Sequence, residues 1–126
     1  MTTVNLSLDN FESTITDNTV VIVDFWAAWC GPCRAFAPVF DKSAQAHPDV
    51  VHAKVDTQAE QELAAALQIR SIPTIMAFRE GGVLVYSQPG GAMPPQALEE
   101  LITKVKALDM AKVRATIAAR RTKADA

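Results

Sequence analysis

The sequence predicts a small α/β domain in which helices cover a central mixed β-sheet. Three observations lead to this fold class. Residues 20–26 are largely apolar and β-branched, which is typical of a strand buried on both faces. Residues 50–56 are predicted to form a second buried strand, and a helical pattern lies between the two. A strand, a helix and a second strand imply parallel pairing. Two further strand patterns flank Glu80-Gly81-Gly82, which is a strong signal for an antiparallel hairpin.

Size and composition limit the classes of protein to which the chain can belong. Its 126 residues are 49% apolar and 21% charged, which suits one domain with a single core. The first residues do not resemble a secretory signal, and no segment approaches the roughly 20 apolar residues of a membrane-spanning helix. We therefore expect a soluble cytoplasmic monomer whose partners include neither membranes nor nucleic acid.

The first half of the chain contains two strands and two helices. A brief opening strand is expected before Ser7, and a short amphipathic helix follows from Phe11. The segment 20–26 is the central strand. The next helix is predicted over residues 34–45 and ends before Pro48, so its amino end falls at the two cysteines.

The second half continues the alternation and then closes the sheet. A final helix opens at a proline pair, where the absence of an amide hydrogen is tolerated in the first turn. The predicted elements are a strand at 50–56, a helix at 60–68, hairpin strands at 72–78 and 83–86, and a last helix from Pro94 to Leu108.

Charge and helical pattern set the last residues apart. Residues 1–102 hold 5 basic and 12 acidic residues, whereas residues 103–126 hold 7 and 2. We therefore divide the chain into a domain at 1–108 and a basic extension at 109–126, which Asp109 would cap as an extra helix with a weak apolar stripe. A solvated helix, docking on the acidic body, dimerisation and binding of an acidic partner all remain open for it.

The chemistry is expected at Cys30 and Cys33, the two cysteines of the chain. A cysteine pair two residues apart at a helix amino end gains the helix dipole and unpaired amides, which stabilise a thiolate. Cys30 is the expected nucleophile because the strand-to-helix junction should expose it. Cys33, one turn inside the helix, should be shielded and should resolve the mixed disulfide. Gly31 and Pro32 would tighten the turn between the two cysteines, and Gly31 would do so by adopting unusual torsions.

A zinc site is the alternative use of the same cysteines. His47 and His52 complete a spacing of Cys-x2-Cys-x13-His-x4-His, which matches a known zinc pattern. Against this alternative, Pro48 breaks any helix that would present both histidines, and the domain has a full core without metal. We therefore expect no metal and take both histidines to be surface residues.

One residue of the central strand is unusual. Asp24 places a carboxylate within an apolar strand, which is costly unless the group is neutral or has a partner. Its pKa should therefore be raised.

Several linked motifs resemble the thioredoxin family in order and spacing. They are Val-Asp-Phe-Trp-Ala-Ala-Trp-Cys-Gly-Pro-Cys-Arg at 23–34, Ala-Lys-Val-Asp at 53–56 and Ile-Arg-Ser-Ile-Pro-Thr at 69–74, and the resemblance covers about residues 4–107. It implies the thioredoxin fold, a mixed five-stranded sheet flanked by helices. It also implies a protein-disulfide reductase that binds no cofactor and cycles through a Cys30–Cys33 disulfide. Electrons would come from NADPH through thioredoxin reductase and pass to disulfide-containing client proteins.

The resemblance also assigns roles to other residues. Asp24 would be the buried acid that exchanges a proton with Cys33, and Lys54 would be its charge partner. A buried ion pair without a catalytic part is the alternative for these two residues. The Ile72–Pro73 bond would be cis and lie against the active-site disulfide. An apolar collar for client docking would comprise Trp29, Gly31, Pro32, Ile72, Pro73, Gly91 and Ala92.

The reducing direction is expected because, among Cys-x-x-Cys proteins, Gly-Pro between the cysteines marks the reducing members, whereas the oxidising members often have His in that gap. The alternative function, from a different class, is that of a chaperone or binding subunit with this fold in which redox activity is dispensable. The intact cysteine motif and Asp24 argue against that alternative.

Overall fold

The computed structural model describes residues 3–125 and contains the predicted mixed sheet. The strand order is β1-β3-β2-β4-β5, with β1, β3 and β2 parallel, and with β4 antiparallel to both of its neighbours. The strands are β1 (Thr3–Asn5), β2 (Val20–Trp26), β3 (Val51–Asp56), β4 (Thr74–Arg79) and β5 (Val83–Gln88). The five-stranded sheet with flanking helices is confirmed.

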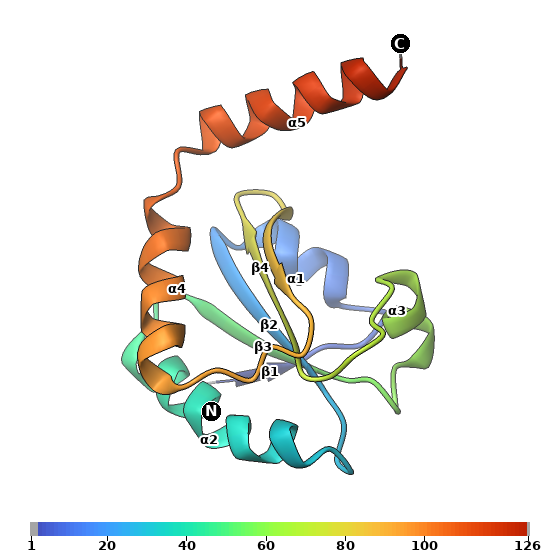
Figure 1. Cartoon of the computed structure of the whole chain (residues 1–126), viewed down its shortest axis with the longest axis vertical. Coiled ribbons are helices and arrows are strands. Elements are labelled where there is room, and N and C mark those ends of the chain that lie inside the picture. Colours follow the sequence, from blue (N-terminus) through green and yellow to red (C-terminus); the bar gives the residue numbers. More distant parts are fainter. Residues whose placement is uncertain (1–2, 126) are drawn as a thin grey trace.

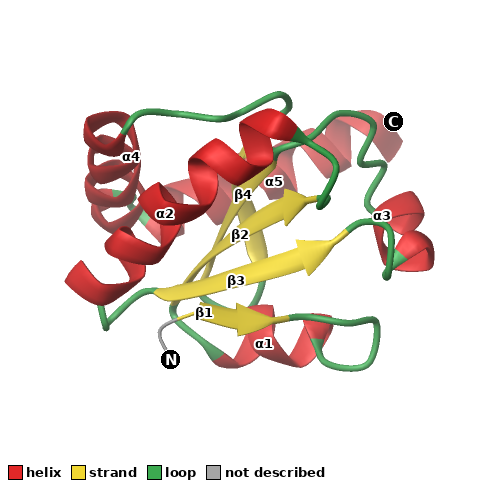
Figure 2. Ribbon diagram, turned by 90° about the horizontal axis from the view of Figure 1, so that it is seen from below, coloured by secondary structure: helices red, strands yellow, loops and turns green. Residues whose placement is uncertain are grey.

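Helices cover both faces of the sheet (Figure 2). The helices α1 (Phe11–Asp17) and α3 (Gln61–Ala66) pack on one face, and α2 (Gly31–Ala46) and α4 (Pro95–Ala107) on the other. The extra C-terminal helix is confirmed as α5 (Met110–Asp125), which extends beyond the turn between β4 and β5 (Figure 1). None of the helices within residues 3–125 combines the length and the apolar character needed to cross a membrane.

The alternation of side chains along β2 determines what lies beneath α2. Val20 and Ile22 belong to the core under α2 and α4, whereas Val21 and Val23 belong to the core on the opposite face. Because successive side chains of a strand point to opposite faces, Asp24 falls on the α2 side. The carboxylate is therefore directed to the layer that carries the cysteines.

Several element boundaries differ from the prediction, and two of these differences lie at the cysteines' end of the molecule. The helix α2 begins at Gly31 rather than at residue 34, because a proline in the first turn is accommodated without loss of a hydrogen bond. The strand β4 begins at Thr74, so Ile72 and Pro73 precede it in an irregular segment. The expected cap of α5 is present, since Asp109 Oδ1 accepts from Ala111 N at 3.1 Å and from Lys112 N at 3.2 Å.

The surface position expected for His52 is wrong. Its side chain is 1% exposed and lies edge-on to the ring of Phe40. Nδ1 contacts the Val50 carbonyl at 3.0 Å and Nε2 contacts Ser43 Oγ at 2.9 Å. Because a carbonyl only accepts, Nδ1 carries the hydrogen and Nε2 accepts from the Ser43 hydroxyl. Burial lowers the pKa of His52 below its ordinary value of 6.5 and keeps the ring neutral.

Candidate functional site

The two cysteines lie where β2 leads into α2. The chain leaves β2 at Trp26, turns through a short loop and starts α2 directly after Cys30, which is the N-cap residue. Cys30 Sγ accepts a hydrogen bond from Cys33 N at 3.3 Å. This amide is one of the first-turn donors that have no partner within a helix, so the helix offers it to the sulfur. The sulfur of Cys30 therefore occupies a position at which negative charge is stabilised.

Cys30 is less accessible than expected. Cys33 is 2% exposed, in agreement with its shielded position, but Cys30 is only 4% exposed. Ala27 shares a small apolar cluster with the two cysteines, and Trp26 and Ile72 pack against it. The exposure predicted for Cys30 is therefore wrong in degree, because the loop and the segment before β4 close over the strand-to-helix junction.

The segment before β4 lies directly beside Cys30. The Cys30 thiol donates to the Ile72 carbonyl at 3.9 Å, and the Ile72–Pro73 peptide bond is cis. Gly91 N donates to the Pro73 carbonyl at 2.6 Å, which joins this segment to the loop after β5. A Cβ added at Gly91 would lie 2.6 Å from the Gln88 carbonyl oxygen, so only glycine fits at this position.

The residues of the predicted collar differ in their accessibility. The side chain of Trp29 is 65% exposed, and Ile72 is half-buried. Pro73 and Gly91 are buried and support the surface from below. Gly31, Pro32 and Ala92 are exposed.

The expectation that Gly31 adopts unusual backbone torsions is wrong. Gly31 is the first residue of α2 and is absent from the residues with positive φ. A Cβ at this position would meet no atom within 4 Å. No torsion and no close contact requires glycine at this position within the described structure.

Asp24 is a buried carboxylate without a hydrogen-bond partner. It is 1% exposed, and neither carboxylate oxygen is bonded to another of the described residues. Burial raises its pKa from 3.8 to about 7, the positive charge of Lys54 opposes that shift, and the negative charge of Asp41 adds to it. At neutral pH the group therefore both gives and accepts protons readily.

Lys54 lies opposite Asp24 in the register between β2 and β3. Its ammonium group lies 5.2 Å from the ring centroid of Trp26, a cation–π arrangement. Among the described residues, the ion pairs do not include one between Lys54 and Asp24. Lys54 therefore acts on the carboxylate through its charge and not through a direct bond.

The thiol of Cys33 has to lose a proton before it can attack a disulfide. Burial raises its pKa to about 12, and the hydrogen bond with Cys30 and the negative charge of Asp24 act in the same direction. A thiol with such a pKa is almost entirely protonated at neutral pH. Its reaction therefore needs a nearby base.

The histidines of the zinc alternative are engaged elsewhere. His47 Nε2 lies 2.7 Å from Glu99 Oε2, and both ring nitrogens of His52 have protein partners. Within residues 3–125, no three side chains of the types that bind metals gather in one place. The residues of the formal spacing thus form no zinc site in this fold.

Arg34 is a contributor that the sequence analysis did not single out. Its Nη1 donates to the Ala28 carbonyl at 2.9 Å and so holds the loop that precedes Cys30. The only signal in the sequence is its position directly after Cys33, which places it in the first turn of α2.

Comparisons with known proteins agree with this geometry. The thioredoxin family model matches residues 2–104. The chain is 51% identical to a putative thioredoxin 2 of Streptomyces coelicolor over 122 residues, covering 97% of this chain and 90% of the relative. It is 40% identical to a thioredoxin of Alicyclobacillus acidocaldarius, covering 82% and 97% of the two chains. Mitochondrial thioredoxin 3 from Saccharomyces cerevisiae superposes with a TM-score of 0.72 at 33% identity, over 81% and 94% of the chains.

Proposed function

Because this chain belongs to the thioredoxin family and is a thiol–disulfide reductase, we propose that Cys30 attacks client disulfides and that Cys33 resolves the product. The observation that carries this assignment is the hydrogen bond from Cys33 N to Cys30 Sγ at the start of α2. It stabilises negative charge on Cys30 and not on Cys33. The two sulfurs therefore have different tasks.

The first step forms a mixed disulfide. The Cys30 thiolate attacks one sulfur of the client disulfide, the client S–S bond breaks, and the second client sulfur leaves as a thiolate that takes up a proton. The Cys33 thiolate then attacks the Cys30 sulfur. The Cys30–Cys33 disulfide forms and the client leaves as a dithiol, having gained two electrons and two protons.

Asp24 is the base proposed for the second step. Cys33 needs to be deprotonated inside the protein, and the carboxylate on the same side of β2 has a pKa of about 7. Its ionised form can accept the thiol proton, directly or through water. Lys54 tunes this group by favouring its ionised form.

The client is proposed to dock on the collar around Cys30. Trp29, Gly31, Pro32 and Ala92 provide exposed surface, and the backbone of Ile72 lies before the first residue of β4. Its peptide groups are thus outside the sheet ladder and available to an extended client segment. Pro73 and Gly91 hold this segment in place through their hydrogen bond.

The direction of electron flow and the cellular setting are part of the proposal. The protein would act as a reductant in the cytoplasm, and thioredoxin reductase would restore its dithiol with electrons from NADPH. It would bind no cofactor or metal and would work as a monomer. The Gly-Pro pair between the cysteines supports the reducing direction.

Insulin reduction coupled to thioredoxin reductase and NADPH tests the activity. We expect turnover with the natural chain and none with Cys30→Ser. With Cys33→Ser, mixed disulfides with insulin should accumulate and be detected by mass spectrometry. Absence of both turnover and trapped species would instead favour a binding subunit whose redox activity is dispensable.

The role of Asp24 is tested by stopped-flow measurement of the second step. Asp24→Asn should slow the release of client from the mixed disulfide by about tenfold to a hundredfold at pH 7. The natural chain should show a rate that rises with pH through about 7, and the variant should lack this rise. An unchanged rate and pH profile would contradict the proton-transfer role.

A further inference from the structure

The strand β5 and the C-terminal helices enclose two hollows. The first, of about 690 Å³, lies between the hairpin turn and α5 and is lined by Leu84, Ile117 and Arg121 among others. The second, of about 260 Å³, lies between β5 and α4 and is lined by Val85, Leu101 and Leu108 among others. Leu84, in the first hollow, pairs with Phe78 of the core under α1, whereas Val85, in the second, packs on the core under α4, so the two hollows lie on opposite faces of β5. We call the first hollow the β5 groove.

The groove displays apolar side chains that a soluble surface usually avoids. Leu84 is 47% exposed and is one of five large apolar residues that are exposed within the described part of the chain. Ile117 and Ala118 of α5 line the groove beside it. Clustered exposure of this kind marks a contact surface more often than scattered exposure does.

Basic side chains border these apolar residues. Arg114 and Arg121 line the groove, and Arg121 takes part in no ion pair within residues 3–125. The described residues that line the groove include no acidic side chain. The groove therefore offers free positive charge beside apolar surface.

The distribution of charge over the chain strengthens this preference. With 5 basic and 12 acidic residues, positions 1–102 carry a net charge of −7, and with 7 and 2, positions 103–126 carry +5. An acidic partner is repelled by the body and attracted to α5, which steers its approach to the groove.

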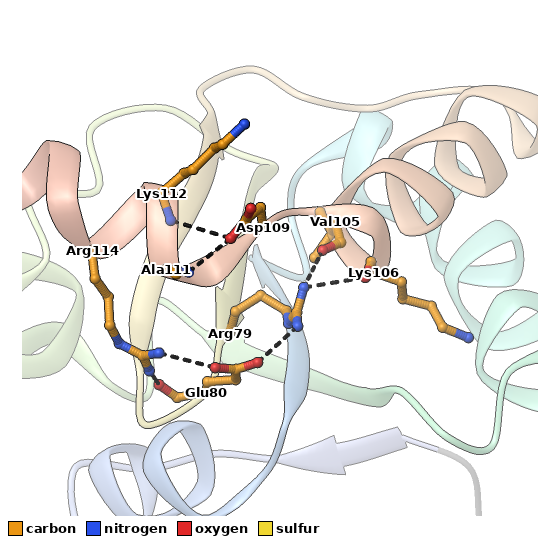
Figure 3. Close-up of polar contacts among 8 residues, drawn as sticks. All are labelled: Arg79, Glu80, Val105, Lys106, Asp109, Ala111, Lys112 and Arg114. Carbon is orange, nitrogen blue, oxygen red and sulfur yellow. Dashed lines mark hydrogen bonds and ion pairs between the residues drawn. The ribbon is translucent and has the colours of Figure 1, made fainter.

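A network of arginines fixes α5 in place (Figure 3). Arg79 Nη1 donates to the Val105 carbonyl at 2.6 Å, at the end of α4, and Nη2 lies 3.1 Å from Glu80 Oε2. Arg114 of α5 donates to Glu80 Oε1 at 3.0 Å and to the Glu80 carbonyl at 2.7 Å. The groove is therefore preformed, and a ligand does not have to order α5 on binding.

The groove lies far from the cysteines in the fold. The hairpin turn follows Arg79, which pairs with Val20 at the first residue of β2, whereas Cys30 follows the last residue of the same strand. In Figure 1, α5 lies at one end of the molecule and the amino end of α2 at the other. A ligand in the groove leaves the thiols free.

From these observations we propose that the β5 groove binds an extended acidic segment with leucine-like side chains, supplied by a partner protein. A leucine-like side chain enters the groove beside Leu84 and Ile117, and a neighbouring carboxylate meets Arg121. An extended segment fits because β5 is the outer strand of the sheet, with β4 as its sheet neighbour. Such a segment on a client would tether that client to the protein while leaving the thiols free, which raises the effective concentration of the client.

The binding test uses the full reduced chain and a cysteine-free peptide of about 12 residues. At a rise of roughly 3.3 Å per residue, an extended peptide of this length is longer than β5. The peptide alternates leucine with aspartate or glutamate and carries fluorescein for anisotropy titration. Arg121→Glu and Leu84→Ser should each raise Kd by about tenfold, as expected for loss of one charge contact or one apolar contact. Arg120→Glu changes the same charge on the same helix at a residue outside both hollows, and should change Kd less than about twofold.

Three results would overturn the proposal. If Arg120→Glu and Arg121→Glu weakened peptide binding equally, the peptide would be attracted to the positive charge of α5 in general and would not bind in the groove. Tighter binding of a single-stranded oligonucleotide, also lost in Arg121→Glu, would assign the surface to nucleic acid. Self-association in analytical ultracentrifugation that Arg121→Glu abolishes would assign it to a second copy of this chain. Circular dichroism checks that each variant retains the fold.

A second measurement connects the groove to turnover. A disulfide peptide extended by the acidic segment should be reduced with a higher kcat/KM than the same peptide without it, and Arg121→Glu should remove this gain. Reduction of the unextended peptide should stay unchanged in that variant. If neither peptide is reduced, the proposed function fails, and the titration still decides whether the groove binds.

Discussion

Asp24 and Arg79 are both buried ionisable residues of the central sheet, but their surroundings are opposite. Asp24, near the cysteines, has no hydrogen-bond partner for either oxygen within the described residues. Arg79, at the other end of the sheet, donates to the Val105 and Lys106 carbonyls and pairs with Glu80. Burial of a charge without a partner costs stability, whereas a bonded guanidinium joins elements. In the proposed mechanism the unpartnered carboxylate takes part in the chemistry, whereas the partnered guanidinium joins β4 to α4.

The largest effect expected from this comparison is on the pH dependence of stability. Because the pKa of Asp24 is raised from 3.8 to about 7, the folded chain holds a proton that the unfolded chain releases. Stability is therefore fully present below pH 3.8 and falls as pH rises toward 7, by about 4 kcal/mol. Asp24→Asn should remove that loss. Urea unfolding of both reduced proteins at pH 4 and pH 8 measures this loss of stability. An equal change in stability for the two proteins between these pH values would contradict the prediction.

The next effect is expected at the partnered residue. Arg79→Met removes the donors to two α4 carbonyls and should lower the free energy of unfolding by about 2 kcal/mol. Arg34→Met is the matched control, because Arg34 is exposed and donates to a single carbonyl, so its loss should cost under about 0.5 kcal/mol. Urea unfolding at pH 7 gives both values. Similar values for the two variants would show that the Arg79 network contributes nothing special.

A smaller effect concerns His52, which is also buried but neutral. Its lowered pKa means that the unfolded chain binds more protons below about pH 6.5, so stability decreases as pH falls. This direction is opposite to that of Asp24. The stability should therefore decrease from pH 6.5 to pH 5. The difference in stability between the natural chain and His52→Gln, followed over this range, isolates it, and a constant difference would refute it.

The smallest effect is expected from removal of residues 109–126. Met110 is the one buried side chain contributed by α5 within the described residues, so the loss should stay below about 1 kcal/mol. Turnover of an unextended disulfide peptide should be unchanged, because the cysteines lie at the other end of the fold. Thermal unfolding and the insulin assay check both values. A large loss of either would contradict the proposed division at residues 108 and 109.

Periodicity predicted the buried elements best. The strand β2 matches its predicted range of residues 20–26, because an apolar β-branched run covered on both faces is a strong signal. The start of α2 was placed three residues late, since Gly31 and Pro32 are poor helix formers in the interior but acceptable in the first turn.

Features that depend on distant segments could not be predicted from local patterns. The burial of His52 depends on Ser43 from α2 and on the Val50 carbonyl, and nothing near His52 in the sequence indicates that both its ring nitrogens would be bonded. The low exposure of Cys30 likewise depends on Ile72, which lies 42 residues away. The link from Arg79 to α4 also joins residues remote in sequence.

The exposure of Trp29 makes the protein its own optical reporter. The chain has two tryptophans, and Trp29 is 65% exposed directly before Cys30, whereas Trp26 is half-buried beneath the site. A collisional quencher such as acrylamide should therefore reach the indole of Trp29 far more readily than that of Trp26. A client seated on the collar shields that indole, so emission follows occupancy in real time. No dye and no added chromophore is needed to watch a client arrive and leave.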